Sequence, residues 1–267
     1  MTEVRFEFGK NWAKFLRTLT NDRITVAEQS LCAMLGREDL SGCRFLDIGS
    51  GSGLFSLAAR RLGAAVVSFD YDADSVACTR TMRDRYFPGD PQWVVDQGSV
   101  LDAAWMQSLG MFDVVYSWGV LHHTGAIWQA MSAACESVRP GGSLFIAIYN
   151  DQGWRSRIWT TVKRTWTRSP RGLRPLVGAP FLLWLWGKSF VFDILRGRPL
   201  ATWRRYSALR GMSAWHDFVD WIGGYPFEVA SPEQVFEFCR ERGFSLQKLK
   251  TVRGSLGCNE FVFVRQR

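Results

Sequence analysis

Residues 46–55 read LDIGSGSGLF and place glycines at positions 49, 51 and 53, directly after an apolar run at residues 43–48 that is typical of a buried strand. A dinucleotide fingerprint needs G-x-G-x-x-G/A, but here its third position holds Leu54, and starting one glycine later it holds a serine. With the dinucleotide fingerprint excluded, the pattern that remains is Asp47-x-Gly-x-Gly-x-Gly. A carboxylate at that place repels a pyrophosphate and suits a cationic ligand, so the pattern argues against NAD.

Short apolar runs alternate with amphipathic segments along most of the chain. Strands that alternate with helices form βαβ units, so we expect a doubly wound α/β fold with a mostly parallel sheet and helices on both faces. The expected strands are 43–48, 64–69, 93–95, 112–116, 143–149, 244–252 and 259–264, and the expected helices are 54–62, 73–86, 125–138 and 232–242.

Sheets of this kind bind ligands at the carboxyl ends of the strands, where the strand order reverses. Asp70 ends the second expected strand, 21 residues after Gly49. A carboxylate there can accept hydrogen bonds from both hydroxyls of a ribose. Residues 97–101 close the third expected strand, and their side chains are placed to frame an adenine. The predicted ligand is therefore a cation that contains a ribose.

At this point the chain resembles the class I S-adenosylmethionine-dependent methyltransferases. The resemblance combines the Asp47-x-Gly-x-Gly-x-Gly loop, Asp70, the block FDVVYSWGVLHH at 112–123 and the V-R-P-G-G turn at 138–142, in that order. It covers residues 43–149, and the last two expected strands complete the family's seven-stranded pattern. It implies a Rossmann-like methyltransferase fold, S-adenosyl-L-methionine as cofactor and S-adenosyl-L-homocysteine as product.

The resemblance also assigns the cofactor site residue by residue. The glycine loop would line the methionine part, with Asp47 beside its ammonium group, and Asp70 would bind the ribose. The family usually has an aspartate where this chain has Ser99, so the adenine contact there is expected from the backbone. The expected cofactor-binding residues are Asp47, Gly49, Ser50, Gly51, Gly53, Asp70, Tyr71, Ser99, Val100, Ser117 and Trp118, with Lys10, Asn11 and Trp12 on an N-terminal segment that closes over the cofactor or packs in the core.

The block SWGVLHHT is most similar to that of the ubiquinone-biosynthesis O-methyltransferases, which often have Glu-His where this chain has His122-His123. Two adjacent imidazoles do not easily share one metal ion, so we predict no metal. An imidazole titrates near neutral pH and suits a general base that takes the proton of a phenol. We therefore expect His122 or His123 to be catalytic, with His216 as second candidate. The alternative is that one of the pair only caps a helix or packs in its loop.

Residues 211–233 combine polar and aromatic side chains and lead into a helix that Ser231 should cap, with Pro232 at its first position. We interpret this stretch as the rim of the acceptor site. A structural alternative is that its tryptophans pin a helix to the sheet and its acids neutralise basic neighbours. The expected acceptor-site residues are Tyr149, Asp217, Asp220, Tyr225 and Glu228.

The net charge of +8 is concentrated in residues 151–210, which hold 13 Lys and Arg against two acids and six of the 13 tryptophans. We interpret this stretch as a basic, Trp-rich helical insertion after the fifth strand. It has three possible roles: a lid or dimer surface, peripheral contact with anionic lipid, or nucleic-acid docking. Nucleic acid ranks last, because the chain lacks both the N/D-P-P-Y motif after the fourth strand and a Pro-Cys nucleophile.

The predicted organisation is an N-terminal helical lid at 1–36, a cofactor-binding core at 37–150, an insertion and acceptor-site segment at 151–230, and a last helix with two strands at 231–267. The N-terminus lacks the apolar stretch of a secretory signal, the longest apolar run has 12 residues, and the six cysteines show no C-x-x-C pair. These features favour the cytoplasm, with the inner membrane surface as an alternative. The predicted function is O-methylation of a small or lipophilic acceptor, the alternative is methylation of RNA or protein, and the oligomeric state is left open.

Overall fold

The computed structural model describes residues 12, 16, 19–170, 172–198, 202, 218 and 221–267, without the side chains of 184–186 and 188. The chain forms two compact units. The described part of the larger unit runs to Gly153 and resumes at Glu228, and that of the smaller unit lies between Trp154 and Phe227.

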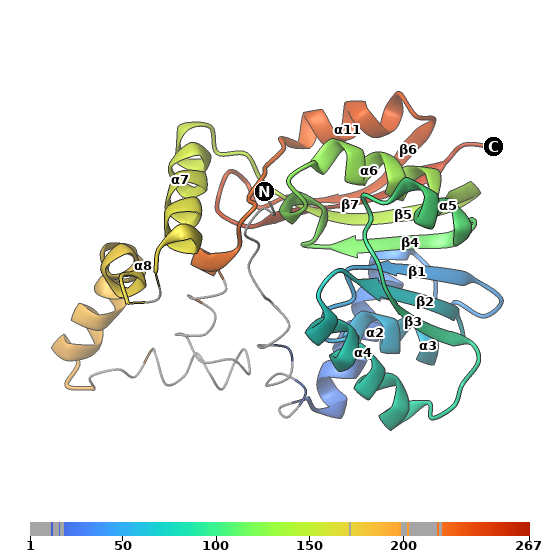
Figure 1. Cartoon of the computed structure of the whole chain (residues 1–267), viewed down its shortest axis with the longest axis horizontal. Coiled ribbons are helices and arrows are strands. Elements are labelled where there is room, and N and C mark those ends of the chain that lie inside the picture. The colour runs from blue at the N-terminus through green and yellow to red at the C-terminus, as the bar shows by residue number, and fades with distance from the viewer. Residues whose placement is uncertain are drawn as a thin grey trace. The chain divides into compact units, whose positions relative to one another are not determined.

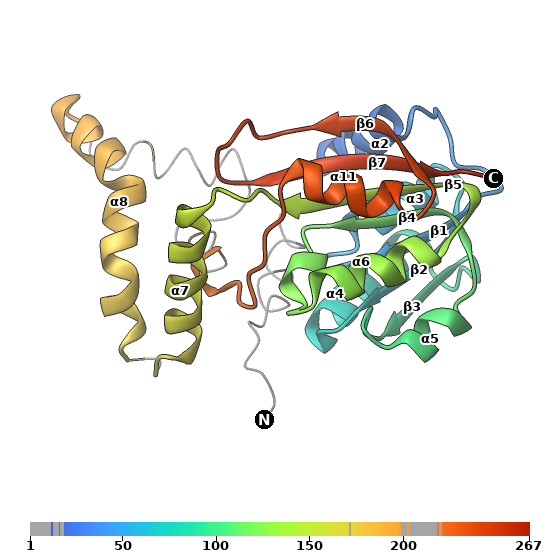
Figure 2. The ribbon, with the colours of Figure 1, turned by 90° about the horizontal axis from the view of Figure 1, so that it is seen from above.

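A seven-stranded sheet forms the centre of the larger unit, with the order β3-β2-β1-β4-β5-β7-β6. Figure 2 shows this order from β3 at one edge to β6 at the other. All neighbours pair in parallel except β7, which is antiparallel to both β5 and β6. The prediction of a mostly parallel seven-stranded sheet is confirmed. The strands are β1 Arg44–Ile48, β2 Ala65–Asp70, β3 Trp93–Gln97, β4 Phe112–Trp118, β5 Val138–Tyr149, β6 Phe244–Lys250 and β7 Cys258–Arg265.

Helices cover both faces of the sheet (Figure 1). Alternate strand residues divide between two cores: Phe45 faces the core with α2, α3 and α4, whereas Leu46 faces the core with α5, α6 and α11. This two-sided burial explains why the strands read as continuous apolar runs. The helices are α2 Asn21–Leu35, α3 Leu54–Arg61, α4 Ala73–Tyr86, α5 Ala103–Ser108, η1 Leu121–His123, α6 Ile127–Glu136 and α11 Pro232–Arg240.

Local sequence sets several helix boundaries. The Ser231 hydroxyl accepts a hydrogen bond from the amide of Gln234, whose side chain in turn accepts from the Ser231 amide, and Pro232 follows the cap. The predicted start of this helix is therefore confirmed. In the same way the Asp72 carboxylate caps α4 by accepting from the Asp74 amide.

The V-R-P-G-G stretch differs from its prediction as a turn. It forms the start of β5, with a register shift against β4 between Phe112 and Val114. Gly142 is required there because a Cβ atom would lie 2.9 Å from the Arg139 carbonyl oxygen and 3.0 Å from that of Asp113. The glycines thus serve a bulge that lets β5 continue along β4.

The smaller unit contains α7 (Trp154–Arg168) and α8 (Arg174–Leu195). The inward face of α7 carries Trp159, whose ring lies 4.2 Å from that of Trp221 and 5.4 Å from that of Phe181 on α8. Lys163, one turn further along α7, is completely buried and donates a hydrogen bond to the Trp221 carbonyl oxygen. None of the described helices is both long and apolar enough to span a membrane.

Candidate functional site

The glycine loop lies where the strand order reverses, between β1 and its two neighbours β2 and β4. Gly49, Gly51 and Gly53 have φ angles of 78°, 54° and 78°, which L-residues with side chains rarely adopt. Space also selects glycine, because a Cβ on Gly49 would lie 2.5 Å from the Val120 side chain and one on Gly51 would lie 3.1 Å from the Trp12 ring. The absence of side chains at these glycines therefore lets other groups approach the loop backbone closely, and the loop is buried from Ser50 to Gly53 before it enters α3.

A buried chain of hydrogen bonds ends on Asp47. The Trp93 ring N–H donates to the Ser68 hydroxyl at 2.9 Å, Ser68 donates to the Ser56 hydroxyl at 2.7 Å, and Ser56 donates to the Asp47 carboxylate. The chain joins β3, β2, α3 and β1, and all of its members are buried. Because each hydroxyl is already oriented, Ser56 can only donate to Asp47. Sequence reasoning missed the three partners, although serines in the apolar stretches VVSFD and LFSLAA were a visible signal.

Burial raises the pKa of Asp47 to about 7, the hydrogen bonds from Ser56 oppose this rise, and the negative charge of Asp70 adds to it. The ionised form of a buried carboxylate with a raised pKa is strongly stabilised by a cation placed beside it. The environment of Asp47 therefore fits the ammonium group of an amino acid and does not fit a phosphate.

Asp70 ends β2 and turns its carboxylate toward the same loop. One oxygen accepts the Gly51 amide hydrogen bond at 3.0 Å, and the other accepts that of Asp72 at 2.9 Å. A carboxylate offers about four acceptor positions, so the two oxygens can still accept from a pair of hydroxyls. Burial raises the pKa of Asp70 to about 6, against the effect of these amides. This geometry fits the two hydroxyls of a ribose.

The remaining predicted cofactor residues differ in what their side chains do. Tyr71 follows Asp70 and is 61 % exposed, and its carbonyl accepts a hydrogen bond from the Gln97 side chain. The Ser99 hydroxyl accepts from the Leu101 amide at 3.2 Å. Val100 packs in the core that contains α5 and α6. At these positions the exposed ring and the backbone are the groups that can meet an adenine.

Ser50 and Ser117 hold the loop from within. The Ser50 hydroxyl is hydrogen-bonded to that of Thr79 on α4 at 2.9 Å, and the Ser117 hydroxyl donates to the Ile48 carbonyl oxygen at 3.1 Å. The next residue, Trp118, is 46 % exposed at the carboxyl end of β4. Of these three predicted residues, Trp118 is the one whose side chain reaches the surface.

His122 and His123 cluster with Tyr149 beside the carboxyl ends of β4 and β5. The His122 ring lies 4.2 Å from the Tyr149 ring and 4.5 Å from the His123 ring, and His123 meets Tyr149 edge-on at 5.6 Å. His122 is buried, and its Nδ1 accepts the Tyr149 amide hydrogen bond at 3.3 Å. His123 is only partly buried. The cluster places an accessible imidazole at the end of the sheet where the cofactor loop lies.

Glu228 joins this cluster to α6. Its amide donates to the His122 carbonyl oxygen at 2.9 Å, and its carboxylate accepts from the amide of Ile127, the first residue of α6, at 3.1 Å. It thus caps a helix from a distant part of the chain. Tyr225 belongs to the smaller unit and is partly buried. Five predicted site residues lie outside the described part of the chain: Lys10, Asn11, His216, Asp217 and Asp220.

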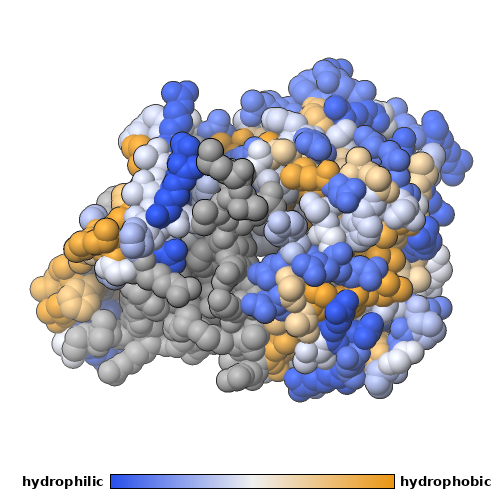
Figure 3. All heavy atoms as spheres, viewed as in Figure 1, coloured by the Kyte–Doolittle hydropathy of each residue, from blue (hydrophilic) through white to orange (hydrophobic). Residues whose placement is uncertain are grey.

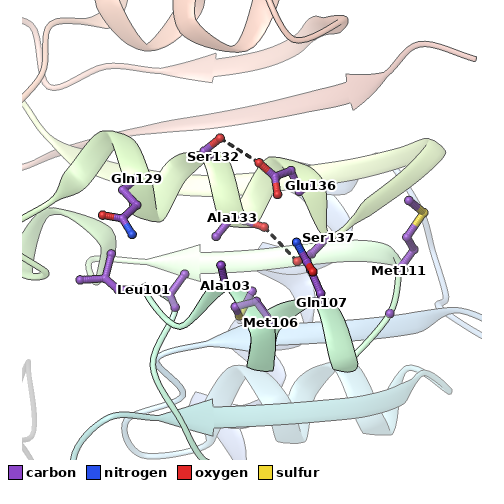
Figure 4. Close-up of a pocket in the computed structure, with 12 residues that line it drawn as sticks. Leu101, Ala103, Met106, Gln107, Met111, Gln129, Ser132, Ala133, Glu136 and Ser137 are labelled. Carbon is purple, nitrogen blue, oxygen red and sulfur yellow. Dashed lines mark hydrogen bonds between the residues drawn. The ribbon is translucent and has the colours of Figure 1, made fainter.

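A pocket of about 430 Å³ lies between α5 and α6 (Figure 4). Its lining includes Leu101, Met106 and Ala133, and it shares Val100 with the predicted adenine contacts. Neither Asp47 nor Asp70 lines it, so it does not contain the two carboxylates of the site built on the glycine loop. Among the described residues no group of three or more His, Cys, Asp or Glu could hold a metal ion, and the expectation of a metal-free site stays a prediction.

Comparison with known proteins agrees with the fold. A family model described as a methyltransferase domain matches residues 14–189. The chain therefore belongs to this methyltransferase family, and its glycine loop, Asp47 and Asp70 fit S-adenosylmethionine, the cofactor of the class. Bound there, this sulfonium compound would supply an activated methyl group.

Curated relatives are O-methyltransferases. Over 133 residues the chain is 30% identical to the ubiquinone biosynthesis O-methyltransferase of Brucella melitensis biotype 2 and 32% identical to that of Rhizobium etli. Each match covers 48% of this chain and 52% of the relative, so the chain spans about half the length of the curated relatives it matches.

Solved methyltransferase structures share the fold. The magnesium protoporphyrin IX methyltransferase of Synechocystis with bound SAM has a TM-score of 0.55 at 11% identity, covering 99% of this chain and 100% of that one. PKMT2 from Rickettsia typhi, in complex with AdoHcy, has a TM-score of 0.58 at 15% identity, covering 90% and 52%.

Proposed function

We propose that the protein transfers the methyl group of S-adenosylmethionine to an oxygen atom of a small or lipophilic acceptor. The observation that carries the proposal is the cluster of His122, His123 and Tyr149 at the end of the sheet that holds the glycine loop. The names of the curated relatives support the choice of oxygen.

His123 is the proposed base. Methyl transfer to a hydroxyl needs little from the protein beyond alignment of the acceptor and removal of its proton, because the sulfonium already activates the methyl group. His122 accepts the Tyr149 amide through Nδ1 and is buried, so its role is to hold the cluster. The partly buried His123 is better placed to take a proton from an acceptor.

Single substitutions separate the histidines. We expect H123A to lower kcat by about 10²–10⁴-fold while the Kd for S-adenosylhomocysteine stays unchanged, because the base does not bind the cofactor. H216A is the matched comparison for the other candidate base. Turnover that survives in H123A but not in H216A would move the role to His216, and turnover that survives in both would remove the histidine mechanism.

The acceptor class is tested with labelled S-adenosylmethionine and a lysate of cells that lack this gene. Label in a solvent-extractable fraction is the expected result and would identify the acceptor. Label that disappears only after ribonuclease or protease treatment would overturn the small-molecule proposal and support RNA or protein as acceptor.

An exposed apolar stripe on α8 supports the proposal that the acceptor is lipophilic and reaches the enzyme from a membrane. Leu176, Leu183, Phe190 and Ile194 recur at intervals of seven, seven and four residues, so they lie along one side of the helix, and each is exposed. Leu195, the next residue and about 100° further around the helix, is 80 % exposed and widens the apolar surface at the end of α8. Figure 3 shows hydrophobic side chains gathered on this part of the smaller unit.

Positive charge follows α8 and is also exposed on the neighbouring helix α7. Arg196 and Arg198 follow α8, and Arg155, Arg164 and Arg168 are exposed on α7. Apolar side chains bordered by arginines match a bilayer surface that contains anionic lipid, in which a helix lies in the plane of the interface. We therefore propose peripheral contact with anionic membranes through α8. This contact would place the protein in the cytoplasm, at the surface of the inner membrane.

Flotation with vesicles tests this contact. The protein should float with vesicles containing anionic lipid, less with neutral vesicles, and weakly with either when Leu183, Phe190 and Leu195 are replaced by Gln. The matched control replaces the exposed Val26 of α2 by Gln, which should change nothing. Equal flotation of the wild type and the α8 variant would overturn the proposal, and a lid or dimer surface would then be the better interpretation.

A further inference from the structure

Tyr116 on β4 carries a buried hydroxyl group that none of the contacts above uses. The side chain is 2 % exposed, and no described residue forms a hydrogen bond with its hydroxyl. Most buried polar side chains have a hydrogen-bond partner, and an unsatisfied one is expected to meet it in a ligand or an ordered water. The hydroxyl of Tyr116 therefore marks a place where a polar group belongs.

The position of Tyr116 is fixed from all sides. The register of β1 and β4 places it directly beside Asp47, on the same face of the sheet. Its ring stacks on Phe55 in the first turn of α3 at 5.0 Å and meets Phe145 edge-on at 5.1 Å. Since α3 begins where the glycine loop ends, the ring packs directly against the helix that the loop enters.

The charges around the hydroxyl are negative. Burial raises the pKa of Tyr116 well above 10, and the carboxylates of Asp47 and Glu260 raise it further, so the group keeps its proton. Glu260 is partly neutralised by Lys250 at 3.0 Å, whereas Asp47 has hydrogen bonds but no ion pair among the described residues. A polar group that enters this place is favoured if it is positively charged.

We propose that Tyr116 and Asp47 together bind the ammonium group of the methionine part of S-adenosylmethionine. The hydroxyl oxygen accepts one N–H of the ammonium, and Asp47 compensates its charge. The role rests on the binding of this cofactor to the glycine loop, and it makes Tyr116 a positioning residue that fixes the amino-acid end of the cofactor.

The test compares the affinities of wild type and Y116F for three ligands by calorimetry. S-adenosylhomocysteine has the complete amino-acid end, its decarboxylated form keeps the ammonium, and methylthioadenosine lacks both groups. We expect Y116F to raise the Kd by about tenfold for the first two ligands and to leave that for methylthioadenosine unchanged. The melting temperature of ligand-free Y116F should equal or exceed that of the wild type, because Phe keeps the ring packing and removes the unsatisfied hydroxyl.

Each other result has a defined meaning. A loss of affinity for all three ligands, or for none, would overturn the proposal, and the latter would assign the hydroxyl to an ordered water. A loss that disappears with the decarboxylated ligand would also overturn it, because the hydroxyl would then bind the carboxylate. Y86F, in which the changed ring lies on α4, is the matched control and should bind all three ligands normally. If the wild type itself binds none of the three ligands, the result contradicts the assignment of S-adenosylmethionine as cofactor, on which the role of Tyr116 rests.

Discussion

At the scale of single residues, Asp47 links the stability of the free protein to the affinity for the cofactor. Burying a carboxylate without a cation is unfavourable, and the pKa of about 7 expresses this cost. The chain of hydrogen bonds through Ser56 offsets part of it and keeps one orientation of the side chain. A bound ammonium group removes the remaining cost. Part of the binding free energy therefore comes from relieving an unfavourable burial that already exists in the free protein.

The affinity for S-adenosylhomocysteine should therefore depend on pH. Only the ionised carboxylate attracts the ammonium group, so affinity is low below the pKa of Asp47 and rises as pH passes through about 7. Between pH 6 and pH 8 we expect the association constant to increase about tenfold, following the ionised fraction. Calorimetry in buffers of equal ionic strength measures it.

Two variants serve as controls for this dependence. D47N should bind weakly, with a smaller pH dependence that reflects Asp70, whose pKa is raised to about 6. S56A should move the midpoint to higher pH, because it removes the hydroxyl that lowers the pKa of Asp47. A flat profile for the wild type between pH 6 and pH 8 would contradict the role of Asp47.

The sequence predicts the two carboxylates but not the chain behind them. Asp47 and Asp70 follow from their spacing relative to the glycines. The partners Ser56, Ser68 and Trp93 lie on three separate elements that meet only when the sheet forms. Likewise the unsatisfied hydroxyl of Tyr116 depends on the packing of β4 against α3, which no local pattern reveals.

At the scale of elements, the sheet was predictable because its strands are buried on both faces and read as apolar runs. The errors lie where local pattern competes with tertiary pairing. The V-R-P-G-G stretch contains turn residues, yet pairing with β4 extends it into a bulged strand. In helix α2 the buried residues Ile24, Ala27, Leu31 and Met34 recur at helical spacing, so the sequence contains enough information to predict where this helix begins and ends. Helix α5 has six residues and is too short to show a helical periodicity.

Helix α6 depends on Glu228 for its first turn. E228A removes the acceptor of the Ile127 amide, so we expect the free energy of unfolding to fall by about 1 kcal/mol, as for the loss of a helix cap. Cofactor affinity should not change. Urea unfolding measures the loss, and E136A at the exposed end of the same helix is the control. A variant with full stability but reduced turnover would instead support the prediction that Glu228 contacts the acceptor.

Helix α7 carries a buried cation. Lys163 lies 4.6 Å from the Trp221 ring and 4.8 Å from the Phe227 ring, and no described acid forms an ion pair with it. Burial lowers its pKa to about 7. In the unfolded chain the lysine holds its proton up to about pH 10.4, so the unfolded state binds more protons between about pH 7 and pH 10. Stability should therefore rise with pH across that window and gain nothing from this group below it.

Melting curves of K163M and the wild type isolate this contribution. K163M should melt about 3–6 °C higher at pH 7, and the difference should shrink as pH approaches 9.5 because the wild type loses its buried charge. K248M removes an exposed lysine of β6 that donates a hydrogen bond to the Ala33 carbonyl oxygen, so any difference between its melting temperature and that of the wild type should stay constant from pH 7 to pH 9.5. A constant difference in melting temperature between K163M and the wild type from pH 7 to pH 9.5 would contradict a lowered pKa for Lys163.

At the scale of the whole molecule, chemistry and charge occupy different parts of the chain. The residues that fit the cofactor belong to the larger unit, whereas 13 of the 33 Lys and Arg fall between residues 151 and 210. The sequence shows this segregation directly, because composition needs no knowledge of the fold. The exposed stripe of α8 required the structure, because an apolar helix of 22 residues can equally be buried.

This separation predicts that the α8 surface affects the supply of acceptor and not the chemistry. With Leu183, Phe190 and Leu195 replaced by Gln, kcat/KM should fall at least about tenfold for an acceptor dissolved in anionic vesicles, because the enzyme no longer concentrates at the lipid surface. For a short-chain, water-soluble form of the same acceptor, kcat/KM and the Kd for S-adenosylhomocysteine should match the wild type. Raising salt should weaken the advantage of the wild type on vesicles, since its arginines face lipid charge across water. Equal losses on both forms of the acceptor would place α8 in the catalytic machinery and contradict a role in membrane delivery.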